Sequence, residues 1–397
     1  MSAAPRALLA EAGLYIHTTA YSVVLGGLIV LVPLYIISLG YNPAWLGLII
    51  AGQGLFQVTV RIFGGVISDR IGERWVIQAS IAALVVGSLG LALSSTLFAL
   101  LLAQVLFGAS RAVYWTSSQS YGSRIDESRP TTLIGRFFGF AAVGGLAGNA
   151  GGGFVAVVLG YQEGFLIAAG LSAGAMFIVA VTPQLPRQAA MTLREILGPV
   201  PGVFRNRATI LPALMALATS VQVAALSSVG AALYKEFGFD DDAFGALMAV
   251  HAFGAIIMGF AFPSLLKRVG QRPTYALTLA THGLPLFAVV MWGGDYTVAI
   301  GLMFILGLSF NAGRILNVSL TAMASSPEQR GVFMAVVGIY WASGQMLGPL
   351  LFGPLASLTS LSASVTVMGV MMLGTALLTP LLYAASGERS NRGSEAE

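Results

Sequence analysis

The sequence predicts an all-α membrane protein with twelve transmembrane helices in two pseudo-symmetric six-helix bundles. Three observations support this fold class. Of the 397 residues, 56% are hydrophobic and only 9% are charged, whereas soluble domains carry about 25% charged residues. The apolar residues form separate runs, each long enough for a helix that crosses a bilayer. A pattern of glycines and basic residues in the first half of the chain recurs in the second half.

The apolar runs define the order of the elements and the domains. Residues 1–183 form an N-terminal six-helix bundle, 184–207 a cytoplasmic linker, 208–386 a C-terminal six-helix bundle and 387–397 a disordered cytoplasmic tail. Within the linker, Met191–Leu197 is amphipathic, and we expect a short helix on the membrane surface. The predicted spans lie at 14–39, 45–68, 75–94, 97–122, 133–159, 164–183, 208–234, 243–265, 273–292, 296–324, 330–357 and 362–385.

The positions of the basic residues predict the orientation. Alternate connections contain almost all Lys and Arg outside the spans, whereas the opposite connections contain only Lys235 together with acids such as Glu163, Asp241 and Asp295. Loops rich in Lys and Arg stay in the cytoplasm. We therefore expect a multi-pass protein of the plasma (inner) membrane with both termini in the cytoplasm and the first helix retained as a span.

The composition also argues against several classes of function. The chain has no cysteine, which excludes disulfides, thiolate metal sites and thiol catalysis. No metal-ligand or catalytic constellation is recognisable, so we expect no enzymatic activity and no cofactor or metal. The pI of about 9.4 follows from the loop charges and implies no nucleic-acid partner. A receptor or scaffold remains an alternative, but no sizeable extramembrane domain is available for signalling.

A charged segment between the second and third spans identifies a family. Its pattern is Gly65-x-x-x-Asp69-Arg70-x-Gly72-x-Arg74, and a partial copy follows at 266–272. The segment resembles the signature loop of the major facilitator superfamily, and the whole chain is similar to its 12-helix drug and metabolite exporters. The resemblance implies a gate in which Asp69 accepts hydrogen bonds from the start of the helix near Arg330. Arg70 and Arg74 would hold Asp69 in place.

The fifth span contains a second resemblance to this family. Gly144, Gly148, Gly152 and Gly153 match the spacing of its antiporter motif, with Asn149 where a proline is usual. Two interpretations of this motif are open. It sets the direction of transport, or it only allows ordinary close helix packing. Gln345 is the corresponding amide in the eleventh span.

Three arginines lie inside predicted spans, where charged groups are costly and mark functional sites. Arg111 and Arg314 are in the fourth and tenth spans, which line the cavity in the resembled family. A guanidinium suits a planar anion, although structural pairing is equally open for both. Arg61 fits a gate, or a side chain that extends to the membrane surface.

Other polar and aromatic residues complete a predicted substrate site at the interface between the halves, near the middle of the bilayer. They suit an amphipathic organic solute, although the aromatic rings also fit simple packing. The full set is Arg111, Trp115, Arg314, Asn311, Asn317, Tyr21, Gln222, Tyr340 and Gln345. His17 and His251 are candidates for proton coupling, with packing as the favoured alternative. Gln104 stands where proton-coupled exporters commonly have an arginine.

These features predict a secondary active transporter that moves a small organic solute by alternating access. Export is the favoured direction, and proton antiport is an option. The alternative is an organic-anion carrier, for uptake or exchange, that uses Arg111 and Arg314. The expected partners are the small-molecule substrate, with an anionic substrate as an open option, the lipid bilayer and protons. We expect a monomer.

Overall fold

A computed structural model describes residues 3–126, 129–185, 198–325 and 330–386, without the side chains of 3–5, 62–70, 130–131 and 330–331. The first half contains six long helices. They are α1 (Ala3–Ser38), α2 (Pro43–Ile71), α3 (Glu73–Leu93), α4 (Leu97–Ile125), α5 (Pro130–Val158) and α6 (Tyr161–Val181). The predicted surface helix Met191–Leu197 and the tail 387–397 lie outside the described residues.

The second half begins with the short helix α8 (Val200–Arg205) and then repeats the six-span plan. Its first span is composite, with η1 (Arg207–Thr209), α9 (Ile210–Ala225), a π-helical turn η2 (Leu226–Gly230) and α10 (Ala231–Glu236). The remaining elements are α11 (Asp241–Val269), α12 (Gln271–Trp292), α13 (Tyr296–Ala324), α14 (Arg330–Leu358), α15 (Leu361–Leu377) and α16 (Thr379–Ala385).

The structure confirms the predicted all-α fold and the number of spans. In the described residues, eleven helical segments are long and apolar enough to cross a bilayer, and α15 with α16 forms a twelfth that is bent by 55°. The bend falls just before Pro380 near the start of α16, because proline lacks the amide hydrogen that would continue the helix.

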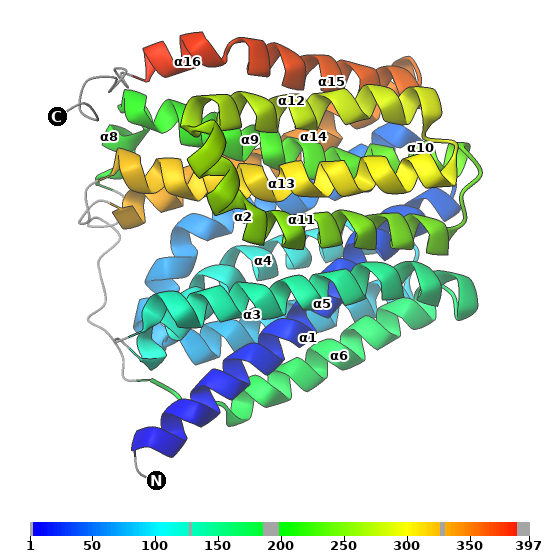
Figure 1. The fold of residues 1–397 in the computed structure, drawn as a ribbon. Helices are drawn as coiled ribbons and strands as arrows, with labels where there is room; N and C mark the ends of the chain where they lie inside the picture. The colour runs from blue at the N-terminus through cyan, green and yellow to red at the C-terminus, as the bar shows by residue number, and fades with distance from the viewer. Residues whose placement is uncertain (1–2, 127–128, 186–197, 326–329, 387–397) are drawn as a thin grey trace, which may run out of the picture.

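The two halves lie against each other along two helix pairs. In Figure 1 the helices of the second half lie mainly above those of the first, and α5 and α11 run side by side between them. The other pair is α2 with α14. Within the halves, α1 packs on α5 and α11 packs on α13. The core between the halves is therefore bounded by two inter-half interfaces, α5–α11 and α2–α14.

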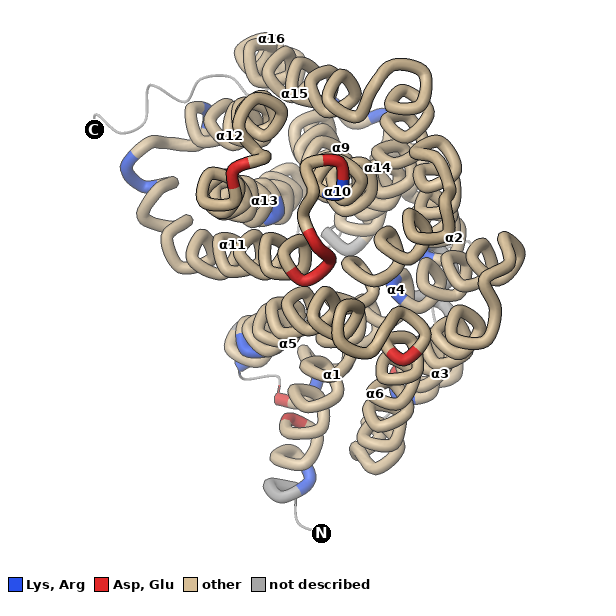
Figure 2. The backbone as a smooth tube through the Cα atoms, turned by 90° about the vertical axis from the view of Figure 1, so that its right-hand side faces the viewer, with Lys and Arg blue, Asp and Glu red and all other residues tan. Residues whose placement is uncertain are grey.

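The ends of the molecule differ in charge. Figure 2 looks onto the end where α6, α11 and α13 begin, called here the acidic end, and shows acidic residues at the starts of its helices and in its connections. They include Glu163, Asp241 and Asp295. The opposite, basic end contains the start of α1 and the ends of α11 and α13 (Figure 1). The compartment that each end faces stays a prediction.

At the basic end, the first half contains its own ion pairs. Glu11 of α1 binds Arg129 at 2.9 Å and Arg136 at 3.1 Å, and Glu73 of α3 pairs with Arg124 of α4. These contacts stay within one half. They can therefore persist when the two halves move relative to each other.

Candidate functional site

A cavity lies between the two halves, among α1, α2, α4, α9, η2, α13 and α14. Its volume is about 120 Å³, below the roughly 300–1,000 Å³ that is typical of pockets for drug-sized ligands. A solute of that size therefore requires the halves to separate. The lining residues are Leu25, Leu28, Ile29, Val32, Pro33, Ile50, Gln53, Gly54, Gln104, Phe107, Arg111, Val223, Ala224, Ser227, Phe310, Trp341 and Gln345.

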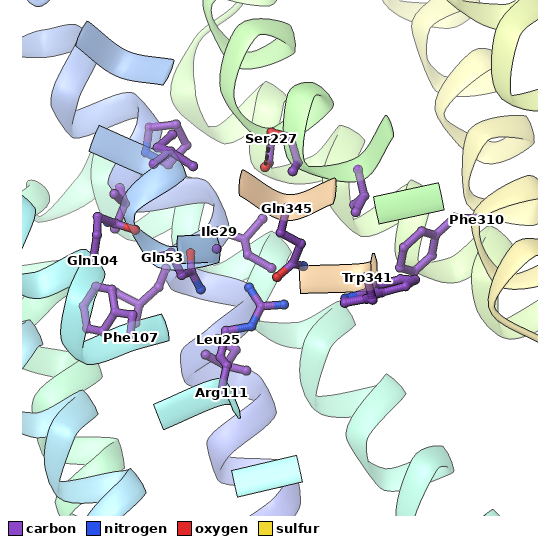
Figure 3. Close-up of a pocket in the computed structure, with 17 residues that line it drawn as sticks. Leu25, Ile29, Gln53, Gln104, Phe107, Arg111, Ser227, Phe310, Trp341 and Gln345 are labelled. Carbon is purple, nitrogen blue, oxygen red and sulfur yellow. Dashed lines mark hydrogen bonds between the residues drawn. The ribbon is translucent and has the colours of Figure 1, made fainter. Parts of the chain in front are cut away.

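Arg111 is the charged residue of this lining. It lies near the middle of α4, and its guanidinium points towards Gln345 in Figure 3. In the described part of the chain it makes no hydrogen bond or ion pair, and none of the described lining residues is acidic. A guanidinium has five donors in a planar fork. The cavity thus offers an unpaired cation with free donors to an incoming acceptor.

Amide side chains share the cavity lining with Arg111. Gln53 of α2 and Gln104 of α4 line the cavity from the first half, and Gln345 lines it from α14 (Figure 3). Gln57, one turn after Gln53, donates a hydrogen bond of 2.6 Å from its Nε2 to Oε1 of Gln345. This bond joins the two halves at the edge of the cavity.

The π-helical turn η2 forms part of the cavity wall that lies opposite Arg111. It contains Ser227, which lines the cavity. A π turn adds one residue to the helical repeat, and such turns occur frequently at functional sites. Phe310 and Trp341 complete this side, with ring centroids 6.1 Å apart. The lining is therefore mainly aromatic and aliphatic, with a few polar groups on α2, α4, η2 and α14.

Tyr21 and Trp115, both predicted to bind substrate, lie inside an aromatic cluster of the first half. The Tyr21 and Tyr114 rings are stacked with centroids 3.4 Å apart, and the Tyr21 hydroxyl bonds Ser110 at 3.0 Å. Trp115 packs edge-on against Tyr21 and lies parallel to Phe138. Neither residue lines the cavity, although Ser110, the partner of Tyr21, directly precedes Arg111 in α4.

Arg314 lies next to the cavity, towards the basic end. Its guanidinium carbon is 5.9 Å from the ring centre of Phe138 in α5 and 5.7 Å from that of Phe310 in α13. The side chain is exposed, and it makes no hydrogen bond or ion pair with the described residues. Phe310 lines the same cavity as Arg111. The structure thus brings the two predicted arginines into one region.

The predicted asparagines and Gln222 point elsewhere. Asn311 donates a hydrogen bond of 2.6 Å to the Ala255 carbonyl of α11, and Asn317 is buried beside Thr321 within α13. Gln222 is fully buried in α9. Tyr340, which was also predicted to bind substrate, packs on Phe204 of α8 with ring centroids 5.7 Å apart. None of these four residues lines the cavity, and their role in binding stays a prediction.

Both candidate histidines are buried within single halves. His17 bonds the Tyr114 hydroxyl at 2.8 Å, and His251 packs against Phe310 with ring centroids 5.3 Å apart. The Nε2 atom of His251 has no partner among the described residues. Neither histidine lines the cavity. Proton coupling through them stays a prediction.

The gate predicted around Asp69 is only partly described. The backbone of Gly65, Asp69 and Arg70 is helical at the end of α2, but their side chains lie outside the described residues. Gly72 has a positive φ of 92°, a conformation that favours glycine, and it separates α2 from α3. Arg74 donates to the Ala180 carbonyl at the end of α6. Its predicted contact with Asp69 is untested.

Arg61 lies on α2 and faces α14. A Cβ on Gly338 would come within 2.5 Å of the Arg61 Nε, so the absence of a side chain at Gly338 makes room for the guanidinium. Gln53, Gln57 and Arg61 are spaced by four residues and form one polar stripe on α2. That spacing was the sequence signal for Gln53 and Gln57, which our sequence analysis missed.

Towards the acidic end, glycines bring the halves into close contact. A Cβ on Gly245 of α11 would lie 2.8 Å from the Gly153 Cα of α5, and one on Gly353 of α14 would lie 2.9 Å from the Gly47 Cα of α2. Backbones approach this closely only where side chains are absent. The halves are therefore in contact on the acidic side of the cavity.

Other glycines of the α5 motif face α1. Cβ atoms on Gly144 and Gly148 would overlap the Thr19 and Val23 carbonyls, and one on Gly152 would lie 2.8 Å from the Gly27 carbonyl oxygen. These three glycines pack the first half together. Gly153 and Asn149 face α11 instead.

Comparison with known proteins agrees with this architecture. The family model of the Major Facilitator Superfamily matches residues 14–225 and 210–397. The chain is 22% identical to the quinolone resistance protein NorA of Staphylococcus aureus (strain COL) over 344 residues, which cover 83% of this chain and 86% of the relative.

Solved structures have the same fold. The nucleoside transporter NupG superposes with a TM-score of 0.77 at 15% identity, covering 96% of this chain and 99% of NupG. A bacterial homologue of the human lysosomal transporter Spinster, in an inward-facing and unoccupied conformation, gives a TM-score of 0.74 at 15% identity, with 96% of each chain covered. The family match spans both halves, and the chain belongs to the Major Facilitator Superfamily of membrane transporters.

Proposed function

We propose that this transporter exports small amphipathic organic solutes and that the cavity around Arg111 is its binding site. The cavity is the observation that carries the proposal. Aromatic and aliphatic side chains make up most of its lining, and the polar groups are Arg111, a few amides and Ser227. Such a lining suits a solute with an apolar ring system and one group that accepts hydrogen bonds.

The similarity to the quinolone resistance protein NorA supports the outward direction. Cells that produce the protein should accumulate less of a transported solute than cells without it. Purified protein in liposomes should move the same solute down an imposed gradient. Failure of every aromatic solute tested, whether neutral, cationic or anionic, would contradict the proposal.

An organic-anion carrier is the second candidate, and the unpaired guanidinium groups of Arg111 and Arg314 favour it. An anion between them would bind donors and relieve the repulsion of two like charges. In this case carboxylates and phosphates should be carried in preference to neutral solutes of equal size. Uptake or exchange is then as compatible with the geometry as export.

Substitution of Arg111 tests both candidates. Arg111→Gln removes the charge but keeps an amide, and a charge-assisted hydrogen bond contributes about 1.5–3 kcal/mol. We expect affinity for an anionic solute to fall roughly 10- to 100-fold, while a neutral solute with the same ring loses little. Arg111→Lys should be intermediate, because lysine keeps the charge without the planar fork.

Thermal-shift titrations of purified protein provide the measurement, with Arg314→Gln in parallel. Anion binding that requires both arginines would favour the carrier. Binding of both neutral and anionic aromatic solutes, in which only the anion is weakened by Arg111→Gln and neither by Arg314→Gln, would favour the exporter. Anion binding that is unchanged in Arg111→Gln would remove the cavity from either account.

A further inference from the structure

We propose that a groove on the outer face of α3 and α4 binds one acyl chain of a membrane phospholipid from the leaflet at the acidic end. The groove is separate from the cavity between the halves. Its volume is about 230 Å³, nearly twice that of the cavity. The inference goes beyond the proposed function, because it concerns the lipid around the transporter and not the solute that it carries.

The lining of this groove is almost entirely apolar. Valine, leucine, alanine and phenylalanine side chains form its walls, and Gly87 and Gly90 leave room on the α3 side. A Cβ on Gly90 would meet nothing within 4 Å, and none of the described lining residues is charged. Val86 of α3 and Leu102 of α4 are 57% and 43% exposed on the same face. The groove therefore opens towards hydrocarbon when α3 and α4 span a bilayer.

The groove has the depth of one leaflet. On α3 it extends from Val86 to Ser94, roughly 12 Å at 1.5 Å per residue, and on α4 from Thr96 to Leu106, roughly 15 Å. One leaflet contributes about half of the ~30 Å hydrocarbon core. A single acyl chain matches this length. A helix from a second copy of the protein would pack along both leaflets, and the groove covers only one.

The two hydroxyl residues of the lining lie at the end of the groove nearest the membrane surface. Ser94 and Thr96 flank the turn between α3 and α4, and their hydroxyl oxygens are 3.0 Å apart. Each hydroxyl can donate a hydrogen bond to an ester or phosphate oxygen of a phospholipid. The polarity of the groove thus follows that of a lipid, with hydroxyls at the head and aliphatic groups along the chain.

The inner side of the groove borders the cavity at a single ring. Gly87 lines the groove, and a Cβ there would lie 2.6 Å from Cε1 of Phe107. Phe107 is 2% exposed and lines the cavity. At this level one glycine and one ring separate the groove from the cavity. A bound chain therefore supports the wall of the cavity from outside.

Photolabelling of the purified protein in detergent micelles tests the site. The probe is phosphatidylglycerol with a diazirine in the middle of one acyl chain, titrated at a low fraction of the micelle. Trypsin cleaves after Arg74 and Arg111, so both walls of the groove lie in one peptide, residues 75–111. We expect saturable labelling of this peptide within residues 86–106. The same chains on phosphatidylcholine should label equally, because the described lining has no charge to select a head group.

Variants that fill the groove should prevent binding. Gly90→Leu places a side chain in the open space beside α3. It should lower labelling of residues 75–111 about 3- to 10-fold at sub-saturating probe, because it replaces packing contacts of the chain. Gly174→Leu is the matched control, because this glycine of α6 is exposed, lies outside the groove and has nothing within 4 Å of its Cβ. Ala99→Leu fills the groove from α4 and decides if Gly90→Leu fails to fold.

Labelling that rises without saturation, or that is unchanged in both folded filling variants, would overturn the proposal. Labelling by phosphatidylglycerol alone would also overturn it, because a head-group charge would then determine binding. So would a change from dimer to monomer in Gly90→Leu, measured by light scattering, since the groove would then hold a second copy. The labelling needs no transported solute, so its outcome is independent of the proposed function.

Discussion

The two inter-half interfaces have similar geometry but different chemistry. In α5–α11 the contact consists of glycine against backbone, with a single amide, Asn149, bonded to a main-chain carbonyl. In α2–α14 the glycines are accompanied by the polar stripe of Gln53, Gln57 and Arg61. The two interfaces therefore share the close backbone approach, whereas the polar groups lie mainly on the interface that borders the cavity.

The glycine contact of α5–α11 predicts where this interface does not tolerate added volume. The α5–α11 contact is rigid, because a Cβ on Gly153 would overlap the Asp241 carbonyl. Overpacking typically destabilises by about 1–3 kcal/mol. We expect Gly153→Leu to reduce transport in proteoliposomes at least ~10-fold and to lower Tm. Gly151→Leu, whose added side chain enters open space, is the control and should retain transport.

Equal losses in Gly153→Leu and Gly151→Leu would show that α5 tolerates no added bulk anywhere along this stretch. The glycine contact with α11 would then have no special importance. Normal transport by Gly153→Leu would show that the halves need not touch here.

The α2–α14 interface allows a comparison within one helix pair. The atoms nearest to a Cβ on Gly54 would be backbone atoms of Gln345 and Met346, whereas those nearest to a Cβ on Gly338 would belong to the flexible Arg61 side chain. The backbone of α14 cannot move aside, whereas the guanidinium of Arg61 can. We expect Gly54→Ala to lower the transport rate roughly 10-fold, because overpacking against backbone costs about 1–3 kcal/mol. Gly338→Ala should lower the rate less than about 2-fold, because its overpacking cost should stay under about 1 kcal/mol.

Initial rates in proteoliposomes, with thermal melting as a check on folding, measure both variants. A stronger effect of Gly338→Ala would indicate that Arg61 itself has to occupy its position during transport.

The sequence predicted the fold well, because each span is determined locally. A run of about 20 apolar residues defines a helix in lipid whatever its neighbours are, and the repeated glycines predicted two equivalent halves. Arg111 and Gln345 were placed in the site from the cost of burying polar groups and from the family resemblance. Both line the cavity.

Other site residues depended on contacts between distant helices, which local pattern does not contain. Asn311 lies on α13, the helix that carries the cavity residue Phe310, but its amide bonds the Ala255 carbonyl within its own half. The spacing on α2 indicates a polar stripe that contains Gln57, but the partner of Gln57, Gln345, follows only from the packing of α2 on α14. The π turn at Ser227 lies within a span that is continuous in its hydropathy, so the apolar pattern does not indicate it.

The smallest expected effect concerns Asn311, which is chemically matched to Asn149. Each asparagine donates its amide to a backbone carbonyl of α11, but Asn311 does so from α13 within the same half, to Ala255, while Asn149 does so from the other half. The first bond lies within one half and is kept when the halves move, whereas the second joins the two halves. Asn311→Leu should therefore destabilise the protein by about 1 kcal/mol, the usual net contribution of one hydrogen bond. It should lower Tm and leave the initial transport rate in proteoliposomes unchanged, whereas Asn149→Leu should change that rate. If the two substitutions changed the transport rate equally, the position of a bond within or between halves would not determine its effect on transport.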